Sequence, residues 1–329
     1  MSVSPPPRPG QGQGGGSQRG STSPLIEINK VAKWYGDVVA LSGVTANIGP
    51  GLTALLGPNG AGKSSLIRIL CGLTSPSQGT VRVIGRNPRA GGEVRKVLGL
   101  VPQQERLPPG VNALEFVGMA AALHGMKDPQ SAARRAIETV ELDPSDPRHL
   151  SAYSKGMRQR VKIAQAIVHE PRILILDEPL NGLDPRQRSR MAQLFIRLGA
   201  EGRCVLVSSH VLEEVQELSS TVLVLAEGKL AAEGDFHAIR QLLDDRPHRI
   251  RLRSSDPLKL ASGLMGSATV SAVQTAGENA VIIDTWSVTP FRRRLPRLAQ
   301  ELDIHLLEVA PLDDDLESVF RYLVARRSP

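Results

Sequence analysis

Short apolar runs that end in polar residues alternate with amphipathic stretches through most of this chain. RILILDEP and CVLVSSH are runs of this kind, and such runs are typical of strands buried on both faces of a parallel sheet. GLTALLGPNGAGKSSLIRIL predicts a strand, a glycine-rich loop and a helix in that order. The pattern therefore predicts an α/β fold.

Further strands are predicted on both sides of a long helical region. LIEINKVAKWYG indicates a strand and a turn, VRVIGR and VLGLVPQ indicate strands, and TVLVLAEGKLAAEG indicates a hairpin. The stretch from about Val111 to Glu170 has mostly helical spacing.

Composition changes near both ends of the chain. Residues 1–23 are mostly Pro, Gly, Ser and Gln, and they cannot bury enough apolar surface to offset the entropy of ordering, so we predict a disordered tail. A second change falls near residues 244–247. Beyond it, HRIRLRSS, AVIIDTW and IHLLEV are strand-like, and two amphipathic helices accompany them. The last helix has an apolar stripe of Leu316, Val319, Phe320 and Leu323. We therefore expect a small α/β accessory domain over residues 246–329.

Composition otherwise limits the function more than it assigns one. With 329 residues, 41% hydrophobic and 22% charged, the chain is long enough for one large and one smaller globular domain. It has no apolar run near the roughly 18 residues that span a bilayer, and no secretory signal. Cys71 and Cys204 lie in apolar segments, which favours a reducing cytosol over a disulfide framework.

The net charge of +7 has two interpretations. It can reflect a basic surface that keeps the protein in solution, or attraction to an anionic membrane face or another polyanion. The densest basic run, Arg292 to Arg294, falls in a predicted helix and favours a solvated face. Aromatic residues make up only 3% of the chain, which weighs against a surface that stacks nucleic-acid bases.

The most specific motif is GPNGAGKSS. It matches G-x-x-x-x-G-K-[ST], and the strand before it and the helix after it disfavour a chance match. The glycines let successive backbone N–H groups point to one centre, to which the helix beginning near Lys63 also directs its positive end. We therefore expect nucleotide phosphates here, with Lys63 at the β- and γ-phosphates and the Ser64 hydroxyl as a Mg²⁺ ligand. The expected nucleotide-binding residues are Gly57, Pro58, Asn59, Gly60, Ala61, Gly62, Lys63, Ser64 and Ser65.

Two adjacent acids follow the predicted strand ILIL. Asp177 ends this strand at its carboxyl end, where ligands of open α/β sheets bind, and we expect it to hold Mg²⁺ directly or through water. Glu178 is then placed to orient and polarise an attacking water molecule. Two acids could also be an ordinary exposed loop, but the phosphate loop upstream favours a site of phosphoryl transfer.

Over about residues 25–234, these motifs and their order resemble the ATP-binding cassette (ABC) ATPases of membrane transporters. The resemblance implies a P-loop NTPase cassette with a mixed sheet, an N-terminal antiparallel β part and a helical subdomain at about residues 104–170. It places the whole ATPase domain at residues 24–245, and it implies ATP and Mg²⁺ as ligands.

The resemblance also assigns residues outside the phosphate loop. Tyr35 matches the aromatic residue that stacks on adenine, although a lone aromatic residue could equally pack in a core. Gln103 matches the glutamine that senses Mg²⁺ and the membrane partner, while neighbouring Gln104 leaves the register open. NGLD, residues 181–184, matches the loop that crosses to the other protomer, and His210 matches the histidine that contacts the γ-phosphate. The implied metal ligands are Ser64, Gln103 and Asp177, and the implied catalytic residues are Lys63, Glu178 and His210.

YSKGM, residues 153–157, stands where the family has its signature sequence, commonly Leu-Ser-Gly-Gly-Gln. Ser154 and the Gly156 amide keep the groups that grip a γ-phosphate, at the positive end of a helix predicted to run to His169. In the family, this motif caps the ATP of the opposite protomer in a head-to-tail dimer. The resemblance therefore implies nucleotide contacts from Ser154, Lys155 and Gly156.

The signature departs from the common form. Lys155 replaces a glycine and Met157 replaces the glutamine, while Leu180 stands where Thr or Ser is frequent. This form is similar to that of the subfamily serving bacterial drug and polysaccharide exporters, whose permeases are separate membrane proteins.

The resemblance thus implies an ATPase that drives a separate transmembrane permease, and an exporter above all. It further implies a homodimer, or a pair with a close paralogue, when ATP is bound, and a cytoplasmic protein held peripherally at the inner face of the cell membrane. The expected permease contact is residues 103–122, whose apolar Leu114, Phe116, Val117 and Met119 could equally belong to the core.

Two other classes of function remain as alternatives. A soluble cassette ATPase acting on nucleic acid or ribosomes would usually carry two cassettes or a long coiled coil, and neither occurs in this sequence, so no direct nucleic-acid partner is expected. A binding module without hydrolysis is disfavoured because Lys63, Asp177, Glu178 and His210 are all present.

Overall fold

The computed structural model describes residues 24–104, 107–218, 221–235, 247–277 and 279–312. The predicted tail at residues 1–23 and the last predicted helix, which carries Leu316, lie outside the described residues, as does most of the predicted composition change at 244–247.

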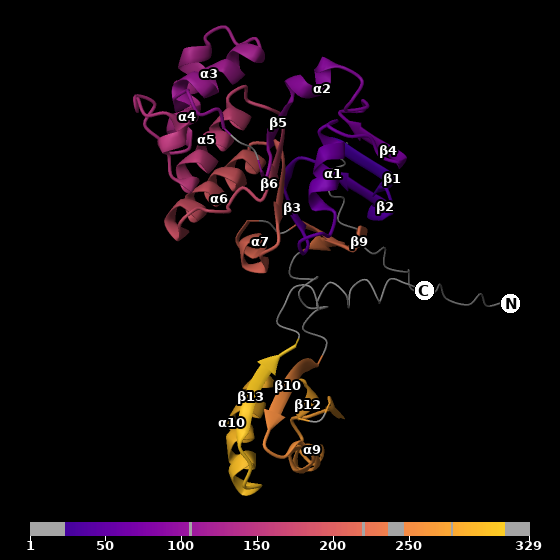
Figure 1. Ribbon diagram of the computed structural model, residues 1–329. Helices are drawn as coiled ribbons and strands as arrows, with labels where there is room; N and C mark the ends of the chain where they lie inside the picture. Colours follow the sequence, from indigo (N-terminus) through magenta and orange to yellow (C-terminus); the bar gives the residue numbers. More distant parts are fainter. Residues whose placement is uncertain (1–23, 105–106, 219–220, 236–246, 278, 313–329) are drawn as a thin grey trace, which may run out of the picture.

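A six-stranded mixed sheet forms the centre of the region from residue 24 to residue 235 (Figure 1). Its first five strands run parallel, and β9 pairs with β8 antiparallel, which confirms the predicted hairpin. Across the sheet, the strands are β5 (Leu98–Val101), β6 (Ile173–Asp177), β7 (Cys204–Ser209), β3 (Gly51–Leu56), β8 (Thr221–Ala226) and β9 (Lys229–Asp235).

The parallel strands are buried on both faces, as their apolar runs predict. In β6, Leu174 and Leu176 pack in one hydrophobic cluster, whereas Ile173 and Ile175 pack in another. The first cluster joins one face of the sheet to the helices α3, α4, α5 and α6. Their bounds are α3 (Ala113–Leu123), α4 (Pro129–Thr139), α5 (Lys155–Ile167) and α6 (Pro185–Ala200).

The second cluster joins the other face of the sheet to α1 (Lys63–Leu70) and to a three-stranded antiparallel sheet. Figure 1 shows α1 beside this smaller sheet, on the side of β3 away from α5 and α6. The smaller sheet has the order β2-β1-β4, with β1 (Ile26–Tyr35), β2 (Val38–Ile48) and β4 (Gln78–Val83). The short helices of this region are α2 (Gly92–Lys96), the 3₁₀ turn at Leu150–Ala152 and α7 (Leu212–Leu218).

Side-chain caps set the starts of the four helices on the first face. Asn112 and Glu115 form a reciprocal capping box at α3, and Asp128, Ser154 and Asp184 cap α4, α5 and α6. Proline at the first position of α4 and of α6 fits the same boundary, because its missing N–H is not needed there. The helical stretch predicted between Val111 and Glu170 is therefore confirmed.

Residues 247–312 include a four-stranded antiparallel sheet with two helices and a hydrophobic cluster of their own. The order of elements is the split β-α-β-β-α-β arrangement, and the strand order is β11-β12-β10-β13. Arg292, Arg293 and Arg294 are exposed on α10, as expected for a solvated face. The elements are β10 (His248–Ser254), α9 (Pro257–Met265), β11 (Ala272–Thr275), β12 (Ala280–Thr285), α10 (Val288–Glu301) and β13 (Leu306–Pro311).

The α/β class and the mixed sheet are confirmed, whereas the strands β2 and β11 were not expected from the pattern. The ladder between β1 and β2 is interrupted by register shifts, so the apolar positions of β2 do not alternate cleanly, and β11 has only four residues. Cys71 and Cys204 are both free, and burial raises the pKa of each thiol to about 12. In the part of the chain that the structure describes, no helix is long and apolar enough to cross a membrane.

Candidate nucleotide-binding site

The predicted phosphate loop lies between the end of β3 and the start of α1. A Cβ atom on Gly57 would lie 2.3 Å from the carbonyl oxygen of Leu225 in β8. Gly62 has a φ of +102°, and a Cβ atom there would lie 2.4 Å from the carbonyl oxygen of Ala40. These two glycines are therefore required by close backbone contacts. Gly62 also leaves the N-terminus of α1 without a side-chain cap, so its N–H groups remain available to an anion.

Lys63 is buried at the first position of α1, with 5% of its surface exposed. Its Nζ donates hydrogen bonds to the carbonyl oxygens of Gly57, at 2.7 Å, and Pro58, at 3.1 Å. Nζ also lies 3.5 Å from Oε1 of Glu178. Burial lowers the pKa of Lys63, and Glu178 offsets part of that effect. A phosphate group bound here would favour the charged ammonium further, so the surroundings of Lys63 suit an anionic ligand.

The ends of β6 and β7 hold the two predicted acids in place. Asp177 pairs with Ser208 in the parallel ladder, and the Ser208 hydroxyl donates to Oδ1 of Asp177 at 2.6 Å. The same hydroxyl accepts the N–H of Glu178 at 2.9 Å. Glu178 has a φ of +49°, a left-handed conformation that costs a non-glycine residue roughly 1 kcal/mol or more. The chain thus turns sharply after Asp177, and strain of this kind is concentrated at functional sites.

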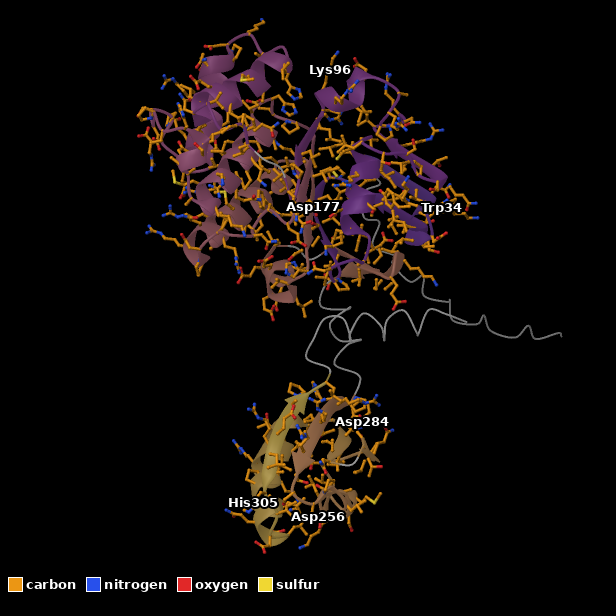
Figure 2. All side chains as sticks on the ribbon, in the orientation of Figure 1. Trp34, Lys96, Asp177, Asp256, Asp284 and His305 are labelled. Atoms are coloured by element: carbon orange, nitrogen blue, oxygen red, sulfur yellow. The ribbon has the colours of Figure 1, made fainter. Side chains whose placement is uncertain are left out.

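The Glu178 carboxylate is the point where three distant segments meet. It is only 6% exposed, and its Oε1 lies 3.1 Å from Nδ1 of His210 and 3.5 Å from Nζ of Lys63. Its Oε2 accepts a hydrogen bond from the side chain of Asn181. In the view of Figure 2, Asp177, the residue before Glu178, is labelled between α1 and the helices of the first face. The structure therefore brings together Lys63, Glu178 and His210, the three predicted catalytic residues.

The predicted magnesium ligands fit a cation that is held mainly by phosphate oxygens and water. Among the described residues, no group of three or more His, Cys, Asp or Glu side chains could hold a metal ion by itself. Mg²⁺ usually takes one or two protein carboxylates together with substrate phosphates. Ser64, at the second position of α1, and Asp177, whose charge also acts on the pKa of Lys63, match this requirement. Bound there, Mg²⁺ would neutralise charge on the phosphates.

Tyr35 ends β1 and is 45% exposed, so the alternative that it packs in the core is wrong. Lys33 places its Nζ 4.8 Å from the centre of the Tyr35 ring. Stacking of Tyr35 on adenine stays a prediction.

Gln103 and Gln104 both line a cavity of about 990 Å³ that also reaches Glu178 and Asn181. Both glutamines are exposed, so the register between them stays open. The cavity lies against α5, whose Lys155, Arg158, Gln159 and Lys162 also line it. Gln103 thus lines the same cavity as the predicted catalytic carboxylate, and its role toward Mg²⁺ stays a prediction.

In the described part of the chain, the signature residues make no hydrogen bond or ion pair to this cluster, although Lys155 lines the same cavity as Glu178. Ser154 is exposed, and its hydroxyl accepts the N–H of Met157 at 3.2 Å, so its observed contact is the cap of α5. Gly156 is buried, and a Cβ atom there would lie 2.9 Å from Oε1 of Gln187. Within the described part of the chain, no hydrogen bond or ion pair joins residues 154–156 to the phosphate loop, residues 57–65.

Sequence reasoning missed two residues that organise the acids. The Ser208 hydroxyl bonds both Asp177 and the N–H of Glu178, and the Asn181 side chain bonds the Glu178 carboxylate. The sequence predicted Asn181 only as part of the NGLD loop and gave it no contact with Glu178. The two serines that interrupt the apolar run CVLVSSH carry the signal for Ser208. In a parallel sheet, they fall at the same edge as the acids that end ILIL.

Comparison with known proteins identifies the family. The ABC transporter family profile matches residues 41–181. "Nod factor export ATP-binding protein I" of Paraburkholderia xenovorans is 32% identical over 309 residues, which cover 92% of this chain and 97% of that protein. The protein of the same name from Rhizobium etli is 31% identical, with coverage of 92% and 93%.

Solved structures agree with the sequence relatives. One, described as the structure of an ATP-binding subunit of an ABC transporter, has a TM-score of 0.61 and 28% identity, and the match covers 66% of this chain and 92% of that one. Another, a dimeric cassette in a post-hydrolysis state bound to ADP and phosphate, has a TM-score of 0.59 and 25% identity, with coverage of 64% and 99%. The chain binds ATP with Mg²⁺ and hydrolyses it, and it belongs to the ATP-binding cassette family of transporter ATPases.

Proposed function

We propose that this chain drives an exporter whose membrane-spanning permease is a separate protein, and that two chains close head to tail around two ATP molecules. The second chain is another copy or a close paralogue. The observation that carries the proposal is the buried meeting point of Lys63, Glu178 and His210, to which, among the described residues, no hydrogen bond or ion pair joins Ser154 or Gly156 of the same chain.

Each chain supplies most of one site. Tyr35 stacks on adenine, the loop from Gly57 to Ser65 holds the phosphates, and Lys63 compensates their charge. Glu178 is the general base, because its carboxylate is buried beside Lys63 and His210 and accepts a hydrogen bond from Asn181 that orients it. In this role Glu178 accepts the proton of the attacking water, while His210 lies at the γ-phosphate.

Ser64, Asp177 and Gln103 hold the Mg²⁺ ion.

The opposite chain completes the site. Ser154 and Gly156 lie at the N-terminus of α5, which carries a partial positive charge, and they close on the γ-phosphate bound by the partner. ATP then binds the closed pair better than the single chain, which shifts association by mass action.

The permease contact is assigned to the segment 103–122. Within it, Val117 is buried in the core, whereas Met119 is 56% exposed. Leu123, directly after the segment, is exposed as well. A coupling element of the permease would cover this face of α3, which places the protein at the inner face of the cell membrane. The names of the two relatives, both export ATP-binding proteins, support export as the direction.

Two domains are part of the same proposal. Residues 24–245 form the ATPase, with a helical subdomain at about 104–170, and residues 246–329 form the accessory domain. The separate hydrophobic cluster within residues 250–306 supports this division.

A pull-down from membranes tests the proposal. Tagged Glu178→Gln protein with ATP and Mg²⁺ should recover a protein with several membrane-spanning helices, and the Met119→Glu variant should recover much less. The control Ile196→Glu changes another exposed apolar residue, on α6, and should recover the permease normally. Recovery of ribosomal proteins or nucleic acid in place of a membrane protein would favour the soluble class of cassette ATPases.

A further inference from the structure

The side chain of Lys155 crosses Gly182, the second residue of the NGLD loop, in its own chain. A Cβ atom on Gly182 would lie 2.7 Å from Cδ and from Cε of Lys155, and 2.9 Å from its Cγ. Gly182 has a φ of +79°, so it is also the residue type that this turn favours. The methylene stem of Lys155 therefore fills the space that the missing side chain of Gly182 leaves.

A second contact of the same helix turn reaches the same place. A Cβ atom on Gly156 would lie 3.2 Å from the carbonyl oxygen of Gly182 and 2.9 Å from Oε1 of Gln187. The first turn of α5 thus packs on the NGLD loop through two consecutive residues. Lys155 and Gly182 are exposed and Gly156 is buried, so a displacement of this turn acts on the loop from both a surface contact and a buried one.

The loop is in turn connected to the catalytic carboxylate. Asn181, next to Gly182, donates its side-chain N–H to Oε2 of Glu178, and its backbone N–H donates to the carbonyl oxygen of Glu178 at 3.3 Å. Lys155, Asn181 and Glu178 also line one cavity. A continuous path of contacts therefore leads from Lys155 through Gly182 and Asn181 to Glu178.

The charged end of Lys155 does not account for its position. In the described part of the chain, its ammonium makes no ion pair or side-chain hydrogen bond, whereas the neighbouring Arg158 donates to the carbonyl oxygen of Tyr153. What the structure shows of Lys155 is its packing through the stem.

We propose that Lys155 is a positioning residue that links the signature of a chain to the Glu178 of the same chain. The inference rests on the proposed function, in which Ser154 and Gly156 grip the nucleotide of the partner while Glu178 acts on its own. Closure of the signature on one ATP then sets the carboxylate that acts on the other ATP, through the stem of Lys155. The two sites are coupled by packing within each chain.

Steady-state ATPase assays on the full-length protein test this link. Lys155→Ala, which removes the stem, should lower kcat roughly ten-fold, since small misplacements of catalytic groups cost about this much or more. It should also lower the Hill coefficient for ATP from about 2 toward 1, because the coupling between the two sites is lost. Lys155→Met keeps most of the stem without the charge, and it should lose clearly less kcat and cooperativity than Lys155→Ala.

A double-mutant cycle separates this link from a general structural defect. Asn181→Ala should lower kcat, and the double variant with Lys155→Ala should be little worse than the more impaired single variant, because both changes break one path. Arg158→Met is the matched control, since Arg158 lies on the same helix and lines the same cavity. It should stay within about two-fold of wild-type kcat.

Three results would overturn the inference: additive losses in the double variant, a Lys155→Met variant as impaired as Lys155→Ala, or a wild-type Hill coefficient of 1. Failure of the proposed function is distinguishable from these. In that case, Glu178→Gln protein with ATP and Mg²⁺ would stay monomeric and Ser154→Arg would keep wild-type turnover, whereas failure of this inference alone would leave both the dimer and the Ser154→Arg defect in place.

Discussion

The cluster around Glu178 and the signature residues Ser154 to Gly156 differ in how far one chain can assemble them. Lys63, Glu178 and His210 come from three segments at the ends of the central strands, and they meet in the interior at 3.1 to 3.5 Å. Ser154 is exposed at the start of α5, and within the described part of the chain its hydroxyl makes only the bond that caps this helix. The sheet brings the first group together within one chain, while Ser154 is left at the surface of α5.

The origin of the two groups explains why Lys63, Glu178 and His210 surround a buried carboxylate, whereas Ser154 lies at the surface. Parallel strands bring the residues after them to one edge of a sheet, whatever their distance along the chain. The first turn of α5 packs on the NGLD loop after β6, but the Ser154 hydroxyl at its N-terminus is exposed and accepts the N–H of Met157 in its own helix. A second chain is the natural source of an anion for this N-terminus. The predictions below test each half of this contrast.

The largest effect is expected at Lys63. Lys63→Ala should abolish ATP binding and turnover, because it removes the charge that the β- and γ-phosphates require and leaves Glu178 buried without that cation. Calorimetric titration with ATP measures the affinity directly. Lys96→Ala, which removes an exposed lysine paired with Glu93, is the control and should bind ATP normally. Unchanged ATP affinity in Lys63→Ala would show that the phosphate loop is wrongly assigned.

The signature should behave in the opposite way. Ser154→Arg should leave ATP binding by the single chain nearly intact and reduce hydrolysis to background, since a bulky side chain there blocks closure on the partner. Photo-labelling by ATP reports binding, and phosphate release reports turnover. Ser151→Arg adds the same charge to another exposed serine three residues earlier and should be far less damaging. If labelling falls as severely as turnover, Ser154 does not act across a dimer.

A smaller loss, in turnover alone, is expected at Glu178. Glu178→Gln keeps the size of the side chain but removes its basicity, which typically costs roughly 10² to 10⁴ in rate. ATP should then stay bound, and light scattering with ATP and Mg²⁺ should detect a lasting dimer that the wild-type protein forms only transiently. Glu213→Gln, a change at an exposed acid, should keep wild-type turnover. A persistent monomer, measured with the permease present, would contradict the shared site.

The sequence predicts the sheet half of this contrast better than the helical half. Apolar runs with acids or serines at their ends predicted the buried parallel strands, and the phosphate-loop pattern located Lys63 together with its strand and helix. The pattern did not reveal that Asn181 binds Glu178 or that Lys155 packs on Gly182. The first is a local contact within the turn after β6, and the second depends on how α5 and the NGLD loop meet in space; no periodicity encodes either of them. The irregular ladder of β2 escaped prediction for a related reason, because register shifts disturb the alternation on which a strand prediction depends.

The smallest expected effect concerns how firmly the helices are held to the sheet. His169, just beyond α5, stacks on His124 at the end of α3, with ring centres 3.6 Å apart, and its Nε2 lies 3.2 Å from the carbonyl oxygen of Leu98 in β5. Burial, and then the neighbouring His124, lowers the pKa of His169 to about 4, from an ordinary value of 6.5. The folded chain therefore favours the neutral ring.

The sign of the pH effect follows from this shift. The stabilisation is fully present above pH 6.5, and it is lost progressively as the pH falls from 6.5 toward about 4, because the unfolded chain takes up the proton first. The loss should be on the order of 1 to 3 kcal/mol in the free energy of unfolding. Denaturant titrations at pH 7.5 and pH 5 measure this loss, and the difference in the free energy of unfolding should shrink in His169→Asn but not in His305→Asn, a change at an exposed histidine.

Hydrogen exchange adds a regional test: after correction for intrinsic rates, amides of α3 and α5 should lose protection at pH 5 before those of β6 and β7. Equal loss in all four elements would mean that the helices and the sheet open as one unit, and that the contrast between them belongs to the site alone.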